Sequence, residues 1–417
     1  MESPGKRKRF NDAGGAAGYL FGDRDRLSVL PDCLLREIMS HMKARQVVQT
    51  CVLSRRWRHL WRSMPCLDVD YKEFEAPGAT YLDYESWEKF EDFMDTLLSP
   101  GNVSIALLDT LRLRSSWGIG RGPGSRWIRR GIKYPHVGDE DPGVLRGTTL
   151  SYNSWRLRRL HLSHIDLSNL FAEHVRTRCQ SLEDLELQSC RFDFQGIIAS
   201  ISLKNLVLKS CMLMGLSEIA TPALKNLVID RGSNFKERQL VITAPALVSV
   251  FLGVSIAIFS GGLSVCDNKI VDRFKILGSG VSNMITNLEV AFSQKMELGE
   301  GSTVIQFNNL RTLVLNRCDL SDDYQILGYF LRNSPNMERL TLVFCKYSDD
   351  TKKKKGPNKS KHAESTPPCP NLVDAPCENL KLTEIIYEED DIRQLIDLLL
   401  RISGNLPNNR IKFTKFS

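Results

Sequence analysis

The sequence lacks three features that would place it in a familiar class. No stretch approaches the roughly 20 apolar residues that a membrane-spanning helix needs, and the opening MESPGKRKRF lacks the apolar core of a secretion signal. The eleven cysteines include no CxxC pair, so neither a disulfide scaffold nor a zinc-finger or RING-type site is indicated. We therefore expect an intracellular protein with reduced, mostly buried thiols, and we predict no metal ion, cofactor or catalytic residue.

The composition is that of an ordinary soluble protein, and its excess charge lies in two places. The formal net charge is +7, but ten basic residues lie in two runs, at 6–9 and 352–361, and the rest of the chain is mildly acidic. Both runs have glycine, proline and serine neighbours, which predicts a disordered basic tail over 1–25 and a solvated Lys/Pro-rich loop over 349–375. The first run also suits a nuclear-import signal, so both nucleus and cytoplasm stay open.

The segment from 30 to 61 has more large apolar residues than three short helices can bury. Its first part carries apolar residues at spacings of three and four, which is typical of one helix face, beginning with a proline in the first turn: Pro31, Leu34, Leu35, Ile38, Met39 and Met42. A second helix is predicted around Val47, Val48, Cys51 and Val52, and a third, with Ser54 as its N-cap, around Trp57, Leu60 and Trp61. Because about forty residues leave too much surface in water, the surplus apolar face should contact something else.

A leucine frame repeats after residue 150. The pattern L-x-x-L-x-L, often followed by cysteine or isoleucine three residues later, begins at Leu157, Leu182, Leu203, Leu224, Leu247, Leu310 and Met337, with a weaker copy at Ile285. The first five copies start 25, 21, 21 and 23 residues apart, inside the range for leucine-rich repeats. Alternation along each strand places the leucines inside a stacked solenoid. We therefore predict core positions, not metal ligands or nucleophiles, for Cys190, Cys211, Cys318 and Cys345.

The region before these repeats is less regular. Between 67 and 150 we expect a linker and an N-terminal repeat cap, with a helix at 87–98. An early repeat is indicated by Leu108, Leu111 and Leu113. Gly/Pro-rich sequence between 115 and 156 interrupts the pattern, so the number of N-terminal repeats stays open.

The return segments and the C-terminal end have patterns of their own. Helices are expected at 169–179 and 324–333, where each would return the chain to the next strand. The last segment predicts a strand at 381–387, an amphipathic helix through 392–399 and a final strand at 410–416. Together these would form a β-α-β cap on the solenoid.

The N-terminal and C-terminal motifs carry a family resemblance. The Leu-Pro start, the LLREI helix and the VLSRRWRHLW helix look like an F-box, and the whole chain resembles plant F-box proteins with leucine-rich repeats. The segment from CENLKLTEI through LIDLLLRIS is similar to the short domain called FBD. The resemblance implies an α+β fold with a three-helix F-box over 26–66, an α/β leucine-rich-repeat solenoid over 151–348 and an FBD-like cap over 376–417.

The resemblance also implies a function. Such proteins are taken to be substrate receptors of SCF-type ubiquitin ligases, in which the F-box docks on a Skp-family adaptor that is joined to a cullin and a RING subunit, while the repeats capture a target protein. It implies a non-catalytic receptor. The adaptor contacts that it implies are Leu30, Pro31, Leu34, Leu35, Ile38, Val47, Val48, Val52 and Trp57.

The residues between the inward leucines should line the concave face, where a target would bind. Arg159 and His161 are expected to pair with Asp184 and Glu186 on the next strand. On the strands that follow, the residue at the same middle position of the concave face is apolar. Uncovered apolar residues usually mark interaction sites. Our hypothesis for target or small-ligand binding comprises Arg159, His161, Glu186, Val207, Val228 and Phe251.

Three functions other than that of a ligase receptor are considered from the sequence. A helix-turn-helix nucleic-acid binder is suggested by Arg55, Arg56, Arg58 and Arg62, but the coherent face of that helix is apolar, so nucleic acid is not the expected partner. An enzyme is suggested only by His161 and His164, which have no acid, base and nucleophile grouped with them. An F-box scaffold without a ligase role stays open.

Overall fold

A computed structural model gives the fold. It describes residues 29–75, 84–99, 108–115, 156–167, 169–192, 196–213, 216–232, 240–254, 274–276, 285–292, 307–318, 320, 325–346, 378–388, 396 and 408–416. The predictions for the basic tail, the 115–156 interruption, the Lys/Pro-rich loop and, apart from Ile396, the helix at 392–399 lie outside these residues. In the described part, no helix has the length and apolar character to cross a membrane.

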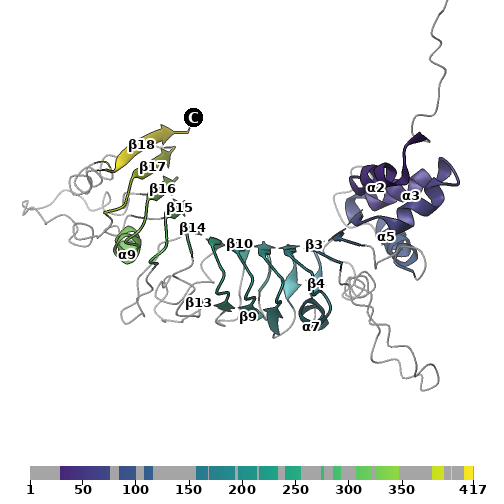
Figure 1. The fold of residues 1–417 in the computed structure, drawn as a ribbon, viewed down its shortest axis with the longest axis horizontal. Coiled ribbons are helices and arrows are strands. Elements are labelled where there is room, and N and C mark those ends of the chain that lie inside the picture. Colours follow the sequence, from purple (N-terminus) through teal and green to yellow (C-terminus); the bar gives the residue numbers. More distant parts are fainter. Residues whose placement is uncertain are drawn as a thin grey trace, which may run out of the picture.

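A twelve-stranded parallel sheet forms the inner side of an arc, with the N-terminal helices at one end and the C-terminal strands at the other (Figure 1). Its strands, in spatial order, are β1 (Cys66–Asp70), β2 (Thr110–Arg114), β3 (Arg159–Ser163), β5 (Asp184–Gln188), β8 (Asn205–Lys209), β10 (Asn226–Gly232), β12 (Ser249–Val254), β14 (Asn287–Phe292), β15 (Thr312–Asn316), β16 (Arg339–Val343), β17 (Leu382–Tyr387) and β18 (Arg410–Lys415). Spatial order follows chain order, as stacked repeats require.

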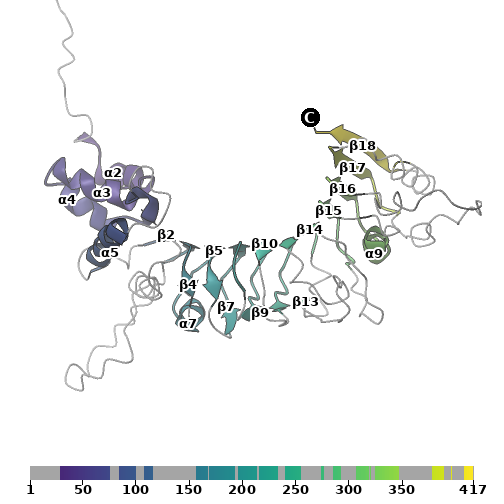
Figure 2. The same ribbon diagram turned by 180° about the vertical axis from the view of Figure 1, so that it is seen from behind.

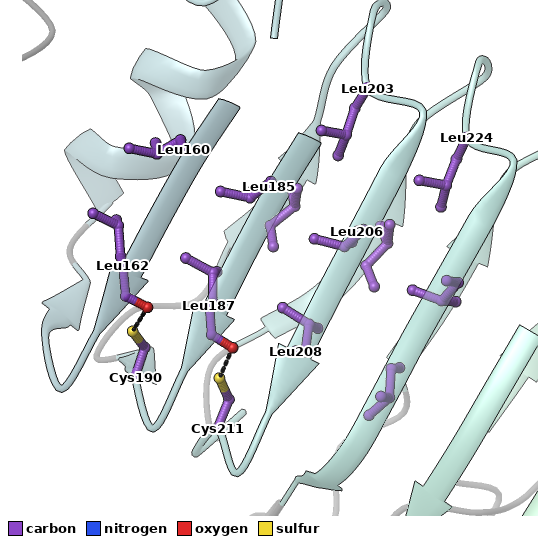
Figure 3. Close-up of a cluster of buried hydrophobic side chains, with 14 of the residues drawn as sticks. Leu160, Leu162, Leu185, Leu187, Cys190, Leu203, Leu206, Leu208, Cys211 and Leu224 are labelled. Atoms are coloured by element: carbon purple, nitrogen blue, oxygen red, sulfur yellow. Dashed lines mark hydrogen bonds between the residues drawn. The ribbon is translucent and has the colours of Figure 1, made fainter. Parts of the chain in front are cut away.

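The leucine frame explains this sheet. Each strand turns alternate residues inward, and the register pairs like positions, so that Leu160, Leu185 and Leu206 lie side by side in consecutive strands. Figure 3 shows these side chains stacked in rows beneath the sheet. The predicted solenoid, the strands at 381–387 and 410–416, and the early repeat at β2 are confirmed.

The turn after each strand is also repeated. Six residues that directly follow strand residues or lie at strand ends have φ between 50° and 58°: His164, Ser189, Ser210, Arg231, Arg317 and Phe344. Two positions beyond the strand, the cysteine of the frame turns inward, and its Sγ donates to a carbonyl of the preceding repeat. The Sγ of Cys190 lies 3.4 Å from the Leu162 oxygen, and that of Cys211 lies 3.2 Å from the Leu187 oxygen (Figure 3). All four frame cysteines are buried, as predicted.

The outer side of the arc is built in two ways (Figure 2). The predicted return helices are confirmed as α7 (Asn169–Thr177) and α9 (Gln325–Asn333). Between them, a four-stranded sheet takes the place of helices, with strands β7 (Gly196–Ala199), β9 (Leu216–Ala220), β11 (Leu240–Thr243) and β13 (Phe274–Ile276). A short pair, β4 (Asp166–Leu167) and β6 (Arg191–Phe192), adjoins the first turns. The β-branched residues of β7 and β11 favour strands over helices.

The N-terminal segment is helical, as predicted. It contains α2 (Asp32–Ser40), α3 (Ala44–Gln49), η1 (Thr50–Val52), α4 (Trp57–Leu60) and η2 (Trp61–Ser63), and after β1 come η3 (Tyr71–Glu73) and α5 (Tyr84–Leu97). Helix α5 confirms the helix expected at 87–98.

Three details of the N-terminal end differ from expectation. Pro31 occupies the N-cap of α2 instead of its first turn. The N-cap prediction for Ser54 is wrong, because α4 begins at Trp57 and its cap position is Arg56, which is already helical. Strand β1 begins at the boundary between the expected F-box and the expected linker and repeat cap, and the sequence did not mark it as a strand. The alternation of Leu67 and Val69 is too short to distinguish from a loop.

Candidate functional site

Helix α2 presents two apolar faces. Leu35 and Met39, four residues apart, are completely buried. Leu34 and Ile38, also four residues apart, are 48% and 41% exposed. Since residues at this spacing share one face of a helix, one stripe packs into the protein and a second stripe faces solvent.

Three further apolar residues of the same segment are exposed. Val29, Val52 and Leu53 are exposed at 79%, 87% and 59%, and we call the exposed apolar residues of 29–53 the apolar patch. Among the described residues, eleven large apolar side chains are exposed, and these three together with the α2 pair make five of them within residues 29–53. This segment is therefore the main concentration of exposed apolar surface in the described part of the chain.

The inner side of the same helices is joined to the sheet. The Lys43 ammonium lies 2.8 Å from Asp68 and 3.6 Å from Asp70, both on β1. The guanidinium of Arg45 lies 4.7 Å from the centre of the Phe74 ring. Buried residues of α2, α3 and α4 also belong to the same continuous core as Leu67. The helices thus have a fixed orientation relative to the sheet.

The basic residues of α4 lie at the edge of an apolar helix. Trp57, Leu60 and Trp61 are buried, as their spacing predicted. The Arg56 side chain donates from Nε to Asp32 Oδ1 at 2.7 Å and from Nη2 to the Leu30 carbonyl at 2.5 Å. Arg56 therefore joins the third helix to the start of α2.

At the end nearest these helices, the concave face is covered by mutually paired charges. Arg159 Nε lies 3.2 Å from Asp184, and His161 Nδ1 lies 3.2 Å from Glu186, which are the cross-strand pairs expected from the sequence. Lys209 also reaches Glu186, at 3.0 Å. Burial lowers the pKa of His161, and the neighbouring Glu186 carboxylate opposes that effect. This end of the face is close to electrically neutral.

A polar hollow of about 160 Å³ lies between the helices and this part of the sheet. It is lined by Lys43, Asp68, Arg112, Leu113, Arg114, His161, Ser163, Glu186 and Gln188. Arg112 and Arg114 lie 3.8 Å from Asp68 and Asp70 respectively. Positively and negatively charged side chains therefore lie next to one another around the hollow.

The middle of the concave face is apolar. Val207, Val228 and Phe251 occupy the same register position on three consecutive strands, and each is half-buried. The next residue of this row is Glu289 on β14. The row predicted from the sequence is thus assembled on the concave face, although none of its three apolar members is fully exposed.

The described residues contain no group of three or more His, Cys, Asp or Glu side chains that could hold a metal ion. Burial lowers the pKa of His164 as well as that of His161. Burial also raises the pKa of Cys179 to about 12, which keeps that thiol protonated and unreactive at neutral pH.

Comparison with known proteins assigns the chain. The model of the F-box domain matches residues 27–68, which include all the helices of the exposed apolar patch. The meiotic F-box protein MOF of Oryza sativa subsp. japonica is 32% identical over 431 aligned positions, which cover 93% of this chain and 85% of the rice protein. The chain belongs to the F-box protein family.

Other relatives of this F-box protein come from Arabidopsis thaliana. A putative F-box/FBD/LRR-repeat protein is 27% identical over 208 residues, covering 43% of this chain and 45% of the relative. F-box/LRR-repeat protein 13 is 40% identical over 76 residues, or 17% of each chain. These names agree with the leucine-rich repeats of the sheet and with the FBD resemblance of the C-terminal segment.

In this F-box protein, the nine predicted adaptor contacts fall into three groups by burial. The exposed ones are Pro31, Leu34, Ile38 and Val52. Leu30 and Val48 are half-buried against the core. Leu35, Val47 and Trp57 are buried inside the protein. The apolar spacing in the sequence identified residues on both faces of the helices, but it could not show which face is buried. It also did not identify Val29 and Leu53, which are exposed.

Proposed function

We propose that this F-box protein is the substrate-recognition subunit of an SCF-type ubiquitin ligase. Its F-box docks on a Skp-family adaptor, which connects it to a cullin and a RING subunit, and the concave face of its repeats captures a target protein. The protein itself is non-catalytic, because ubiquitin transfer is performed by the partner subunits. It acts inside the cell, in the nucleus or the cytoplasm.

One observation carries the adaptor half of this proposal: the apolar patch of residues 29–53. A contiguous apolar surface usually marks an interaction site, because its exposure to water is unfavourable. The F-box match covers the whole of this patch, and an F-box implies a Skp-type adaptor. The proposed contact surface is Pro31, Leu34, Ile38, Val52 and Leu53, with Leu30 and Val48 at its half-buried margin.

The three buried residues among the nine predicted adaptor contacts have a different role in this proposal. Leu35, Val47 and Trp57 shape the F-box from within and attach it to β1. Because the F-box and the sheet share one core, a docked adaptor has a fixed direction relative to the concave face. A fixed direction suits a receptor, since it places the target consistently relative to the transferring subunit.

The test replaces Leu34 and Ile38 with alanine. Truncating an anchor in an interface centre costs about 2 kcal/mol or more, roughly thirtyfold in affinity, so the double variant should lose adaptor binding in titration calorimetry with a purified Skp-family adaptor. Both side chains are exposed, so folding should be unaffected, which a thermal melt verifies.

The matched control is Ile197→Ala with Ile201→Ala, an exposed apolar pair on the outer side of the arc. It should bind adaptor like the natural protein. Unchanged adaptor affinity in the Leu34/Ile38 variant would overturn the assignment of the surface. Adaptor binding without recruitment of cullin and RING subunit would instead favour an F-box scaffold without a ligase role.

A further inference from the structure

The acidic residues of the concave face differ in whether they have a cationic neighbour. Near the F-box, Asp68 faces Lys43, Asp184 faces Arg159, and Glu186 faces both His161 and Lys209. At the far end, Glu384 lies 2.6 Å from Lys412. Each of these carboxylates is neutralised by a neighbouring side chain.

Two carboxylates near the middle of the face are less well neutralised. Asp230 has Lys209 as its register partner on β8, but the Lys209 ammonium pairs with Glu186 instead, at 3.0 Å. Glu289 accepts only a long hydrogen bond, 3.4 Å, from the Asn316 amide, and in the described part of the chain no ion pair to Glu289 is formed. Asp230 lies 3.9 Å from Arg231, the next residue in the chain, whose side chain is 82% exposed. Contacts with so exposed a side chain contribute little, so both charges are available.

Phe251 lies between these carboxylates. Its register partner on β14 is Glu289, so the two side chains project from the same face of adjacent strands. Gly253 lies near both the Phe251 ring and Asp230. A Cβ added to this glycine would lie 2.8 Å from the Phe251 ring and 2.8 Å from Asp230 Oδ1. The ring therefore leans over Gly253 towards Asp230. The glycine leaves the space that lets ring and carboxylate meet.

We propose that Phe251, Asp230 and Glu289 bind a lysine or arginine side chain of the target, presented in an extended segment whose adjacent apolar residue rests on Val207 and Val228. This inference rests on the proposed function, in which the concave face captures a target. An aromatic face attracts a cation, and the two carboxylates add charge complementarity, because Asp230 has only the weak contact with the exposed Arg231 side chain and Glu289 forms no ion pair among the described residues. A half-buried setting strengthens both attractions relative to bulk water.

The contrast along the row supports a basic segment over an acidic one. An acidic segment would place its charge beside Asp230 and Glu289, which is unfavourable, and would gain nothing near the F-box, where the cations are already paired. A purely apolar segment would leave two half-buried carboxylates uncompensated, which costs affinity. The basic segment satisfies the ring, the carboxylates and the valines together.

The experiment selects binders from a random library of short peptides displayed on phage, using the immobilised full-length protein. Enriched peptides should carry lysine or arginine next to a large apolar residue. Their binding should fall by about tenfold or more in Glu289→Gln and in Asp230→Asn, and it should weaken as ionic strength rises. Phe251→Leu keeps the apolar surface and should lose the preference for a basic residue.

The matched control is Glu384→Gln, which removes a carboxylate of the same row that is already paired with Lys412. It should bind the selected peptides like the natural protein. Enriched peptides that are acidic or purely apolar, equal binding by the Glu289 and Asp230 variants, or no enrichment at all would overturn the inference. Adaptor titration separates these outcomes from failure of the proposed function, because it depends on Leu34 and Ile38 and on none of these residues.

Discussion

On the core side of the main sheet, the leucines that alternate in β3, β5, β8 and β10 are at most 1% exposed, whereas five large apolar side chains of residues 29–53 are 41% to 87% exposed. Both regions are rich in apolar residues. A repeat buries its leucines against the next copy of itself, so stacking completes the core within one chain. The F-box helices share a core with the sheet on one side, and their second apolar face is exposed.

The strongest way to test this comparison is to truncate one leucine in each region. Leu206 in β8 is completely buried, so Leu206→Ala should lower the free energy of unfolding by about 2–5 kcal/mol. The matched change on the F-box, Leu34→Ala, removes the same atoms from an exposed site and should change it by no more than about 0.5 kcal/mol. Urea denaturation of both variants measures the difference.

Equal losses in the two variants would contradict the comparison. They would mean that Leu34 is packed in the free protein and that the exposed face of α2 is covered. A loss in adaptor affinity for Leu34→Ala, with unchanged stability, would separate the two uses of leucine most clearly.

The difference between the repeats and the F-box helices also explains which parts of the structure the sequence could predict. The repeat frame located β3, β5, β8, β10, β12, β14, β15 and β16, because period-two alternation decides which side of a strand each residue faces. In the F-box helices, Leu34 and Leu35 are adjacent and equally apolar. Which of them is buried depends on how α2 packs against α4, η2 and β1, and these elements lie further along the sequence.

Two further features could not be read from the sequence for related reasons. The return strands β7, β9 and β11 pair with one another on the outer side. The β-branched residues of β7 and β11 favour strands, but the sequence of a single short segment does not show its partner. The site around Phe251 depends on its register with Glu289 and on the space above Gly253. Alternation predicted that Phe251 would lie on the concave face, but it could not identify the carboxylates beside it.

A second test concerns the cysteine sulfur atoms that the described repeats bury directly after their strands. Cys211 is completely buried, with its Sγ 3.2 Å from the Leu187 carbonyl oxygen. Cys211→Ser places a hydroxyl there on a shorter bond, which weakens that contact, so we expect a loss of about 1–3 kcal/mol. Cys211→Ala removes the sulfur and should cost about 1 kcal/mol.

The order of these two losses decides what the cysteine does. A larger loss for serine means that the position acts as an apolar plug, in keeping with a repeat core that is satisfied by apolar contact. A larger loss for alanine would mean that the hydrogen bond to the preceding repeat matters more than the apolar contact. Urea denaturation of the two variants in reducing buffer distinguishes these outcomes.

A third test examines the connection between the two regions. Lys43, at the start of α3, bridges Asp68 on β1 at 2.8 Å, and both side chains are partly exposed. A double-mutant cycle with Lys43→Met and Asp68→Asn should give a coupling energy of about 1 kcal/mol. The free energy of unfolding of the four proteins gives this value. A coupling near zero would mean that the shared apolar core and the contact of Arg45 with Phe74 fix the orientation of the F-box without help from this pair.

The smallest expected effect is a pH dependence at the concave end next to the F-box. Burial lowers the pKa of His161 in the folded protein, although Glu186 opposes this, while the unfolded chain has the ordinary value of about 6.5. Below that value the unfolded chain takes up a proton that the folded protein resists, so this contribution to stability is complete above about pH 6.5 and declines as the pH falls towards the folded pKa. The pKa of His164 is lowered in the same way, so His161→Gln should flatten the pH dependence of the urea midpoint without abolishing it. An unchanged slope, or a natural protein that gains stability on acidification, would mean that the attraction of Glu186 for a protonated His161 outweighs burial, and that this end of the face can still accept charge.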